Sequence, residues 1–216
     1  MTISASVEDY AKAVYALESR HGVASTTALA ERLGVSAPAV SAMVKKLASV
    51  GYVTYVRYRG VRLTEDGRRV ALEVLRHHRL LETFLVEELG LPWDRVHAEA
   101  EVLEHVLSDG LEARIAAKLG DPTHDPHGDP IPALDGTVDE PPTAALESLP
   151  AGSHGMFVRV SDSDPMLLRK LADLGIRPGD AVEVIGTRPT TRIRSRAKTV
   201  PIPPLLARVM RVEVDA

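Results

Sequence analysis

The chain has 216 residues, 44% of them hydrophobic and 26% charged, which is typical of a globular protein large enough for more than one core. It contains no cysteine, which excludes disulfides, thiolate metal ligands and a cysteine nucleophile and agrees with the reducing cytoplasm where we expect the protein to be. The net charge of -4 is unevenly distributed: residues 1–74 carry 10 basic and 7 acidic side chains, residues 75–150 carry 5 and 16, and residues 151–216 carry 11 and 7. A basic N-terminal region beside an acidic middle suggests a phosphate-facing domain joined to a cation-binding one.

The first predicted element is a helix over residues 7–20, because apolar side chains recur at helical spacing from Tyr10 to Leu17. Ser6 and Asp9 have a capping-box-like spacing, so the simplest role of Asp9 is to stabilise the start of this helix. The stretch is acidic and amphipathic and contains no long apolar run. We therefore expect neither a signal peptide nor a membrane span here.

Residues 26–48 are predicted to form a helix-turn-helix. A short helix ends at Gly34, and a second helix begins near Ser36. Ser36 is a suitable N-cap, and Pro38 belongs in the first turn of a helix, where its missing N–H costs nothing. The second helix of such a motif enters the major groove of DNA.

Two β-prone runs, 52–56 and 61–63, flank a basic and aromatic tetrapeptide and predict a hairpin, which would be the wing of a winged helix. Basic side chains would contact phosphates and short ones would face base edges, so direct readout should be sparse and DNA shape should contribute. A winged helix that binds protein is the alternative. The candidate DNA-binding residues are Thr27, Ser36, Pro38, Ser41, Ala42, Lys45, Lys46, Arg57 and Arg59, with Arg62 as a further phosphate contact.

The middle region is predicted to be helical, with helices over residues 64–89, about 94–108 and 111–119. Four side chains of the second helix are spaced so that they would share one face: His97, Glu101, Glu104 and His105. Two carboxylates held so close repel each other unless a cation or a proton intervenes, so the pattern indicates a divalent metal site. An ordinary solvated helix face is the alternative. The region also carries more apolar surface than one small bundle buries, which favours a symmetric dimer.

The remainder of the chain is predicted to be a linker followed by a small β module. Residues 133–150 are acidic and rich in proline, as linkers are. Beyond them, residues 156–160, 181–185 and 209–214 are predicted to be strands, and a helix between the first two starts at Asp164 and ends at Gly175. The expected fold class is mainly α with small β, divided into residues 1–74, 75–132, 133–150 and 151–216.

The order of these elements and three motifs carry a family resemblance. The motifs are His-Arg-Leu-Leu-Glu at 78–82, Val-His-x-Glu-Ala-Glu-x-x-Glu-His at 96–105 and Asp-Pro-His-Gly-Asp-Pro-Ile-Pro at 125–132. The chain resembles the diphtheria toxin repressor family of metal-dependent transcriptional regulators. The resemblance implies a winged helix-turn-helix, a helical metal-binding and dimerisation domain and a C-terminal SH3-like β-barrel domain. It also implies a homodimer that binds palindromic operators and represses metal-uptake genes.

The resemblance further implies two metal sites. The family's iron branch has Met and Cys where this chain has Asp9 and Glu101, and its manganese branch has carboxylates there. The chain therefore resembles a manganese transport regulator with a primary site formed by Asp9, Glu101, Glu104 and His105. An ancillary site would draw on His78, Glu82 and His97, with Asp125, His127, Asp162 and Asp164 as further candidates. Short manganese regulators have a glutamate in place of Lys12 and use it for a paired-metal site, so Lys12 favours two separated sites.

Carboxylate and imidazole ligands without sulfur suit Mn²⁺ or Fe²⁺, while Co²⁺, Ni²⁺, Zn²⁺ and Cd²⁺ are expected to substitute in vitro. An Fe²⁺-dependent regulator of the same family, a metal-independent winged-helix regulator and a metal-dependent hydrolase are the alternatives. The sequence contains no Gly-x-Ser-x-Gly, P-loop, Gly-x-Gly-x-x-Gly or His-Glu-x-x-His motif. We therefore expect a DNA-binding protein that has no membrane partner and no small-molecule substrate, and that is not an enzyme.

Overall fold

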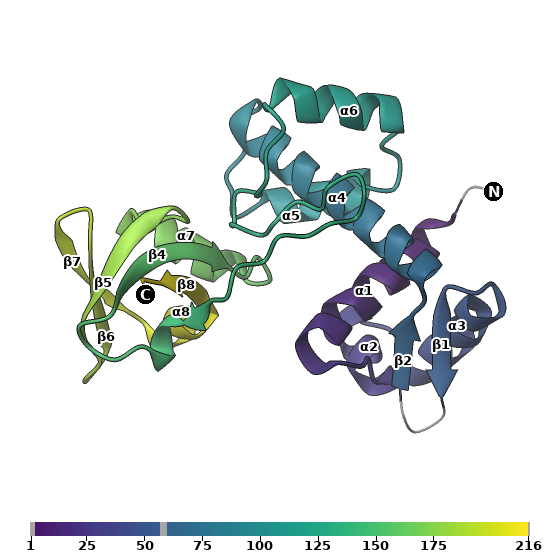
Figure 1. Ribbon diagram of the computed structural model, residues 1–216, viewed down its shortest axis with the longest axis horizontal. Helices are drawn as coiled ribbons and strands as arrows, with labels where there is room; N and C mark the ends of the chain where they lie inside the picture. Colours follow the sequence, from purple (N-terminus) through teal and green to yellow (C-terminus); the bar gives the residue numbers. More distant parts are fainter. Residues whose placement is uncertain (1–2, 57–59, 216) are drawn as a thin grey trace. The chain divides into compact units, whose positions relative to one another are not determined.

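Figure 1 shows the computed structural model, which describes residues 3–56 and 60–215. The chain forms two compact units, each of which is assembled from separate segments. The first unit contains the residues up to His78, Leu103–Ser108 and Pro132–Thr137, and the second contains Arg79–Val102, Asp109–Ile131 and the residues from Val138 onward. None of the helices in the described ranges is long and apolar enough to cross a membrane.

The N-terminal elements confirm the predicted winged helix-turn-helix. Its elements are α1 (Ala5–His21), α2 (Thr26–Leu33), α3 (Ala37–Ser49) and the antiparallel strands β1 (Val53–Val56) and β2 (Gly60–Leu63). Gly34 ends α2 with a φ of 64°, a left-handed conformation that glycine adopts readily. The Oγ of Ser36 accepts a hydrogen bond from the amide of Ala39, and Pro38 lies in the first turn of α3. The predicted turn and cap are therefore the ones that form.

The core of the winged helix contains one buried side chain or more from each of these elements. Leu17 on α1, Leu29 on α2, Val44 on α3, Val53 on β1 and Val61 on β2 belong to the same buried cluster. Apolar residues at helical and strand spacing therefore meet in one core, which fixes α1 against the helix-turn-helix.

Three further helices follow, α4 (Glu65–Glu87), α5 (Val96–Leu103) and α6 (Asp109–Lys118). The prediction of one continuous helix over 94–108 is wrong, because α5 ends at Leu103 and Glu104 and His105 lie in a turn. The reason is tertiary. Nδ1 of His77 lies 3.1 Å from the carbonyl oxygen of Glu104, and the Glu104 side chain bonds to other parts of the first unit. These bonds replace those that a continuing helix would have made.

The C-terminal part of the second unit is a curled antiparallel sheet with strand order β3-β8-β4-β5-β6-β7, as expected of an SH3-like fold. The strands are β3 (Ala144–Ala145), β4 (His154–Val160), β5 (Asp180–Gly186), β6 (Thr191–Ser195), β7 (Lys198–Ile202) and β8 (Met210–Val214). The helical segments are η1 (Leu146–Ser148), α7 (Pro165–Leu174) and α8 (Pro204–Val209). Sequence reasoning did not find β6, β7 or α8, and it assigned β3 and η1 to the linker.

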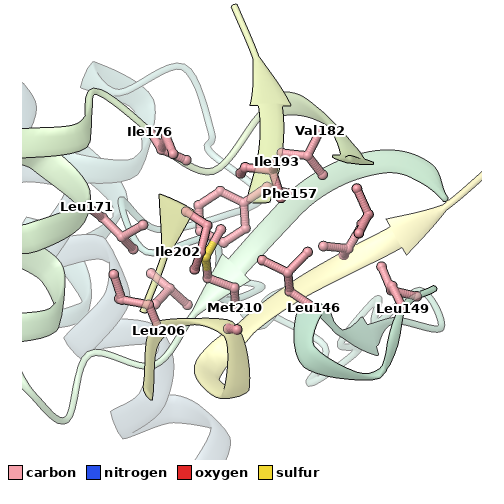
Figure 2. Packing of buried hydrophobic residues seen from close by; sticks show 14 of the residues in the cluster. Leu146, Leu149, Phe157, Leu171, Ile176, Val182, Ile193, Ile202, Leu206 and Met210 are labelled. Carbon is pink, nitrogen blue, oxygen red and sulfur yellow. The ribbon is translucent and has the colours of Figure 1, made fainter. Parts of the chain in front are cut away.

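Buried apolar side chains fill the interior of this sheet. Phe157, Leu171, Ile193, Ile202 and Met210 come from β4, α7, β6, β7 and β8, and each is fully buried (Figure 2). The alternation of buried and exposed residues along β6 follows the period of two of a strand. β6 is short and arginine-rich, so its periodicity becomes recognisable only once its inner face is known.

Trp93, which precedes α5, belongs to the same core as these strands. The Arg177 guanidinium lies 5.3 Å from the centre of the Trp93 ring, and Arg169 of α7 contacts the Asp94 carboxylate at 2.7 Å. The large apolar area of a buried tryptophan is a strong anchor. The helical segment and the β module of the second unit are therefore packed together.

The loop over residues 125–131 docks on β4. The amide of Val160 donates a hydrogen bond of 2.9 Å to the carbonyl of His127. Gly128, at a φ of 86°, passes so close to this strand that an added Cβ would lie 1.8 Å from the carbonyl oxygen of Val158. Only glycine permits this approach, which sets the position of His127.

Candidate metal centres

The first cluster, which we define as Asp9, Glu104 and His105, lies within the first unit. Nε2 of His105 is 3.0 Å from Oδ1 of Asp9 and 3.5 Å from Oε1 of Glu104. One potential ligand atom from each residue lies within 4.8 Å of the other two, as coordination of a single ion requires. Helix α1 supplies Asp9, and the turn after α5 supplies the other two candidate ligands. Residues some 95 positions apart in the sequence are thus brought to one point.

Glu8 holds the histidine of this cluster. Its Oε2 is 2.6 Å from Nδ1 of His105, which leaves Nε2 on the side of Asp9 and Glu104. A carboxylate on the far nitrogen of a ligating histidine fixes the orientation of the ring and increases its basicity. Sequence reasoning missed Glu8, because the only signal for it is its place beside Asp9 on the same helix.

Two cationic or potentially cationic side chains bind the Glu104 carboxylate, which is fully buried. Nζ of Lys12 is 2.5 Å from Oε1, and Nδ1 of His78 is 2.5 Å from Oε2. A buried carboxylate is stable only when it is paired or hydrogen-bonded, and these contacts satisfy that need. The side chain of His77 is also buried and faces the Glu104 carbonyl.

The family resemblance assigns Glu101 to the primary site and His78 to the ancillary site. Oε1 of Glu101 lies 3.7 Å from Nε2 of His97, both on α5 in the second unit. His78 lies one turn before Glu82 on α4 and contacts Glu104, as described above. The metal-binding roles of Glu101 and His78 stay predictions.

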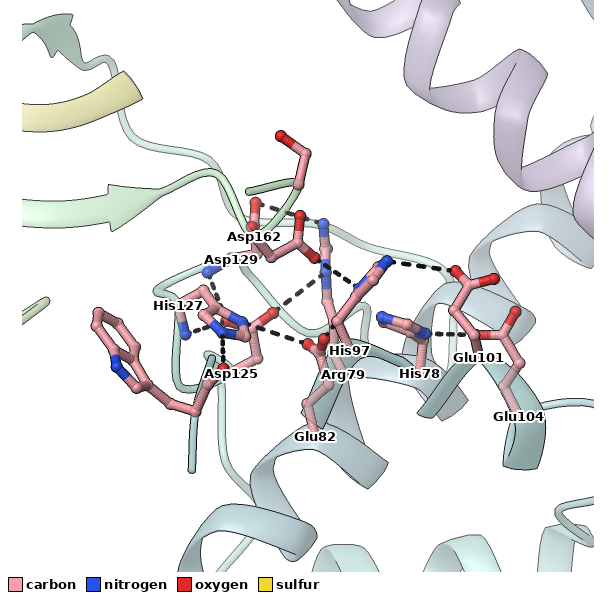
Figure 3. A network of polar contacts seen from close by, with 12 residues as sticks. His78, Arg79, Glu82, His97, Glu101, Glu104, Asp125, His127, Asp129 and Asp162 are labelled. Atoms are coloured by element: carbon pink, nitrogen blue, oxygen red, sulfur yellow. Dashed lines mark hydrogen bonds and ion pairs between the residues drawn. The ribbon is translucent and has the colours of Figure 1, made fainter. Parts of the chain in front are cut away.

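The second cluster, which we define as Glu82, His97, Asp125, His127 and Asp162, lies within the second unit (Figure 3). Nδ1 of His97 is 3.3 Å from Oε1 of Glu82 and 3.0 Å from Oδ2 of Asp162. On the other side of Glu82, Oε2 is 3.6 Å from Nδ1 of His127. Helices α4 and α5, the 125–131 loop and the segment after β4 each contribute, so Glu82 lies between two histidines.

Charge pairing decides the protonation of these two histidines. The hydrogen bonds from His97 to Asp162 and Glu82 raise the pKa of His97 to about 10. Burial alone would lower the pKa of His127, but the Glu82 carboxylate outweighs burial and raises this pKa to about 9. Burial would likewise raise the pKa of Asp162, but the bond to His97 prevails and lowers it. Without a metal, both imidazoles are therefore cations near neutral pH.

His127 is held with one ring nitrogen toward Glu82. Its Nε2 donates to the carbonyl oxygen of Trp93 at 2.8 Å, and its backbone amide donates to Asp125 at 2.8 Å. Among the described residues, its buried Nδ1 has no hydrogen-bond partner. A buried nitrogen beside two buried carboxylates, Glu82 and Asp125, is a donor set that suits a divalent cation.

Arginines bind the outer carboxylates of this region. Arg79 lies 3.5 Å from Asp129 and 3.8 Å from Asp125, and Arg159 of β4 lies 3.4 Å from Asp129. Burial raises the pKa of Asp125 well above its usual value in spite of Arg79. Asp164, also a predicted ligand, accepts a hydrogen bond from the amide of Met166 and caps α7. Its observed contact is therefore a capping one.

The candidate DNA-binding residues lie on the winged helix. Those within the described ranges are exposed: Thr27 on α2, Ser36 before α3, Pro38, Ser41, Ala42, Lys45 and Lys46 on α3, and Arg62 on β2. Arg57 and Arg59 lie outside the described residues. The exposed start of α3 is accessible, as contact with a DNA groove requires.

Comparison with known sequence families accounts for most of the chain. Residues 2–61 match the iron dependent repressor N-terminal DNA binding domain, and residues 64–133 match the iron dependent repressor metal binding and dimerisation domain. Residues 144–214 match the FeoA domain. These three matches follow the order of the winged helix, the helical segment and the curled sheet.

The similarity to individual relatives extends over nearly the whole length. The chain is 36% identical to the iron-dependent repressor IdeR of Mycobacterium tuberculosis, over 95% of this chain and 96% of that protein. It is 33% identical to the diphtheria toxin repressor of Corynebacterium diphtheriae, over 95% and 96%. A solved manganese-dependent transcriptional repressor in complex with manganese superposes with a TM-score of 0.87 at 43% identity, over 96% and 99%. The chain therefore belongs to the diphtheria toxin repressor family of metal-dependent, DNA-binding transcriptional repressors, which dimerise and are not enzymes.

Proposed function

We propose that this repressor responds to Mn²⁺, that its homodimer binds palindromic operators in the metal-loaded state, and that it controls metal-uptake genes. The observation that carries the choice of metal is the donor set of the first cluster, two carboxylates and one imidazole in a chain without cysteine. Hard oxygen ligands with one nitrogen suit Mn²⁺, whereas sulfur ligands favour softer ions. The 43% identity to a repressor in complex with manganese supports the same choice.

An Fe²⁺-responsive repressor is the second candidate. The 36% identity to the mycobacterial iron-dependent repressor favours it, and oxygen and nitrogen donors accept Fe²⁺ as well. Ligand type by itself also admits Co²⁺, Ni²⁺, Zn²⁺ and Cd²⁺. Selectivity then depends on coordination number, geometry and the supply of each metal in the cell.

The primary site of this proposal consists of Asp9, Glu104 and His105, with Glu101 as a fourth ligand. Asp9 lies on α1, which belongs to the core of the winged helix, and Glu104 and His105 lie in the turn after α5. A bound cation would supply the charge that holds these carboxylates together. Ligands from two elements favour the arrangement in which both reach the ion, and such differential binding is what an allosteric switch needs.

The ancillary site of the proposal is centred on Glu82, with His97, Asp125, His127 and Asp162 as its other ligands and His78 as a further candidate. Asp162 follows β4, so this site would couple metal binding to the docking of the β module. In this proposal, residues 1–74 bind DNA, and residues 75–132 hold the metals and dimerise. The linker predicted over 133–150 ends before β3, and the β module from β3 onward supports the ancillary site.

Operator binding at controlled free metal tests the proposal. Fluorescence anisotropy with a labelled operator should show an increase in affinity of about 5- to 150-fold when Mn²⁺ replaces chelator, which is the usual range of allosteric coupling. Parallel anaerobic titrations with buffered Fe²⁺ separate the two candidates. Equal operator affinity in chelator and in Mn²⁺ and Fe²⁺ would refute metal control, and activation only at Fe²⁺ would refute the choice of manganese.

A further inference from the structure

We propose that Lys12 is a tethered ammonium ion that competes with the activating metal for Glu104 and so sets the metal concentration at which the repressor binds DNA. This inference rests on the proposed function, because it takes the first cluster to be the regulatory metal site. It concerns a residue that supplies no ligand of its own.

The contacts of Glu104 are the starting point. Nζ of Lys12 lies 2.5 Å from Oε1 of Glu104, and the same oxygen is 3.5 Å from Nε2 of His105. The ammonium therefore binds the carboxylate oxygen that faces the cluster, whereas His78 binds the other oxygen, Oε2. A metal ion that used Oε1 would need the site that Lys12 occupies.

The position of Lys12 on α1 makes this contact stable. Lys12 follows Asp9 by three residues, so both side chains lie on one face of the helix. The side chain of Lys12 is 14% exposed and that of Glu104 is fully buried, so water screens the ion pair only weakly. One helix thus delivers a ligand and a competing cation to the same cluster.

A competitor of this kind changes the response without changing the ligands. If only a fraction of the molecules has Oε1 of Glu104 available to the metal, the apparent dissociation constant for the metal rises as that fraction falls. Lysine suits this role because its point charge sits on a flexible stem that can withdraw to solvent when a divalent ion arrives. The repressor would then stay inactive at low metal concentrations that would activate it if Lys12 carried no charge.

A purely structural Lys12 would behave in the opposite way. If its only role were to hold Glu104 in place, removal of the ammonium would leave the carboxylate less ordered and would weaken metal binding. The sign of the change in metal affinity therefore separates the two roles.

The experiment is a competition titration of Mn²⁺ against a chromophoric chelator, carried out on the full chain in a Glu82→Gln background. That substitution removes the central carboxylate of the second cluster, so the first cluster dominates the signal. Lys12→Met removes the charge but keeps most of the stem, Lys12→Gln keeps a neutral hydrogen-bond donor, and Lys12→Arg is the matched control that keeps the charge. We expect Lys12→Met and Lys12→Gln to bind Mn²⁺ about tenfold more tightly or better, and Lys12→Arg to stay near the parent.

Operator binding supplies the second readout in the otherwise unaltered chain. The free Mn²⁺ concentration at half-maximal DNA binding should fall in Lys12→Met and Lys12→Gln by the factor found for metal affinity. Thermal unfolding in chelator identifies any variant that has lost its fold. If Lys12→Met does not fold, the comparison of Lys12→Gln with the parent tests the proposal.

Unchanged or weaker Mn²⁺ binding in the folded, uncharged variants would overturn the competitor role. The competitor role would also be overturned if Lys12→Arg bound Mn²⁺ as tightly as the uncharged variants. If the parent chain itself bound operator equally in Mn²⁺ and in chelator, the proposed function would fail, and that failure is seen without any Lys12 variant.

Discussion

The two clusters use the same ligand chemistry, carboxylates and imidazoles, but they neutralise their charge in different ways. In the first cluster, a lysine and a histidine bind the buried Glu104, and the candidate ligands come from α1 and from the turn after α5. In the second cluster, Glu82 lies between two histidines with raised pKa values, and one carboxylate, Asp162, comes from the β module. The first cluster is thus built into the DNA-binding unit, and the second into the junction with the sheet.

This difference suggests that metal binding at the two clusters has different effects on the protein. Metal at the first cluster would act directly on α1 and therefore on the winged helix. Metal at the second cluster would act on the packing between the helices and the sheet of the second unit. Substitutions confined to one cluster test whether the two are separable in this way.

The largest effect is expected from Asp9→Asn, which removes a charged ligand from the first cluster. The Mn²⁺-induced gain in operator affinity, typically about 5- to 150-fold for such coupling, should be lost. Anisotropy titrations with and without Mn²⁺ measure it. Asp66→Asn is the matched control, because this exposed aspartate lies on α4 in the same unit and its carboxylate lies 3.1 Å from the guanidinium of the exposed Arg69. A full metal response in Asp9→Asn would show that Asp9 is not a ligand of the activating metal.

Asp162→Asn is expected to weaken the second cluster and spare the first. Loss of one carboxylate should reduce metal affinity at the second cluster by about 10- to 100-fold, comparable with the loss of a supporting residue. Isothermal titration of Mn²⁺ resolves the two sites. Asp164→Asn, two residues away, serves as the control because this side chain caps α7. If both substitutions changed metal binding equally, the β module would not supply a specific ligand.

A smaller effect is expected from Glu8→Gln, which removes the negative charge behind His105. The imidazole should become less well oriented, and metal affinity at the first cluster should fall by about tenfold. The same titration measures this change, with the exposed Glu73→Gln on α4 as the control. An unaltered affinity would mean that Glu8 does not orient the ligand.

The smallest effect concerns pH and the second cluster in chelator. Because the folded pKa of His97 is raised to about 10 from an unfolded value of 6.5, its pairing with Asp162 stabilises the fold fully below pH 6.5. That contribution is lost as the pH rises through about 10. The difference in unfolding free energy between the parent and His97→Gln, measured by denaturant titration, should therefore shrink from pH 6.5 to 10. Solvent screens the half-exposed His97, so the expected change is small. A difference that stayed flat across this pH range would contradict the ion pair.

Local sequence patterns specified the winged helix almost completely. Ser36, Pro38 and Gly34 act within a few residues of themselves, through a cap, a first turn and a left-handed helix end. Periodic apolar residues then place each element's inner face toward one core. The family resemblance added the candidate ligands, including Asp9, whose role no local pattern distinguishes from capping.

Tertiary structure alone decided the contacts that define the clusters. The bond of Lys12 to Glu104 and the contact of Glu8 with His105 join residues more than 90 positions apart, and the end of α5 at Leu103 depends on the contact of His77 with the Glu104 carbonyl, 27 positions away. Helical periodicity carries no information about such pairs. Sequence patterns did not predict strands β6 and β7 for a related reason. Their residues alternate between buried and exposed only relative to a core that other strands help to form. Local sequence was sufficient for the helices and the hairpin of the winged helix and for the kinds of candidate ligand, because those depend on neighbours along the chain. Only the folded structure determined which charge faces which, because electrostatic pairing depends on distance in space.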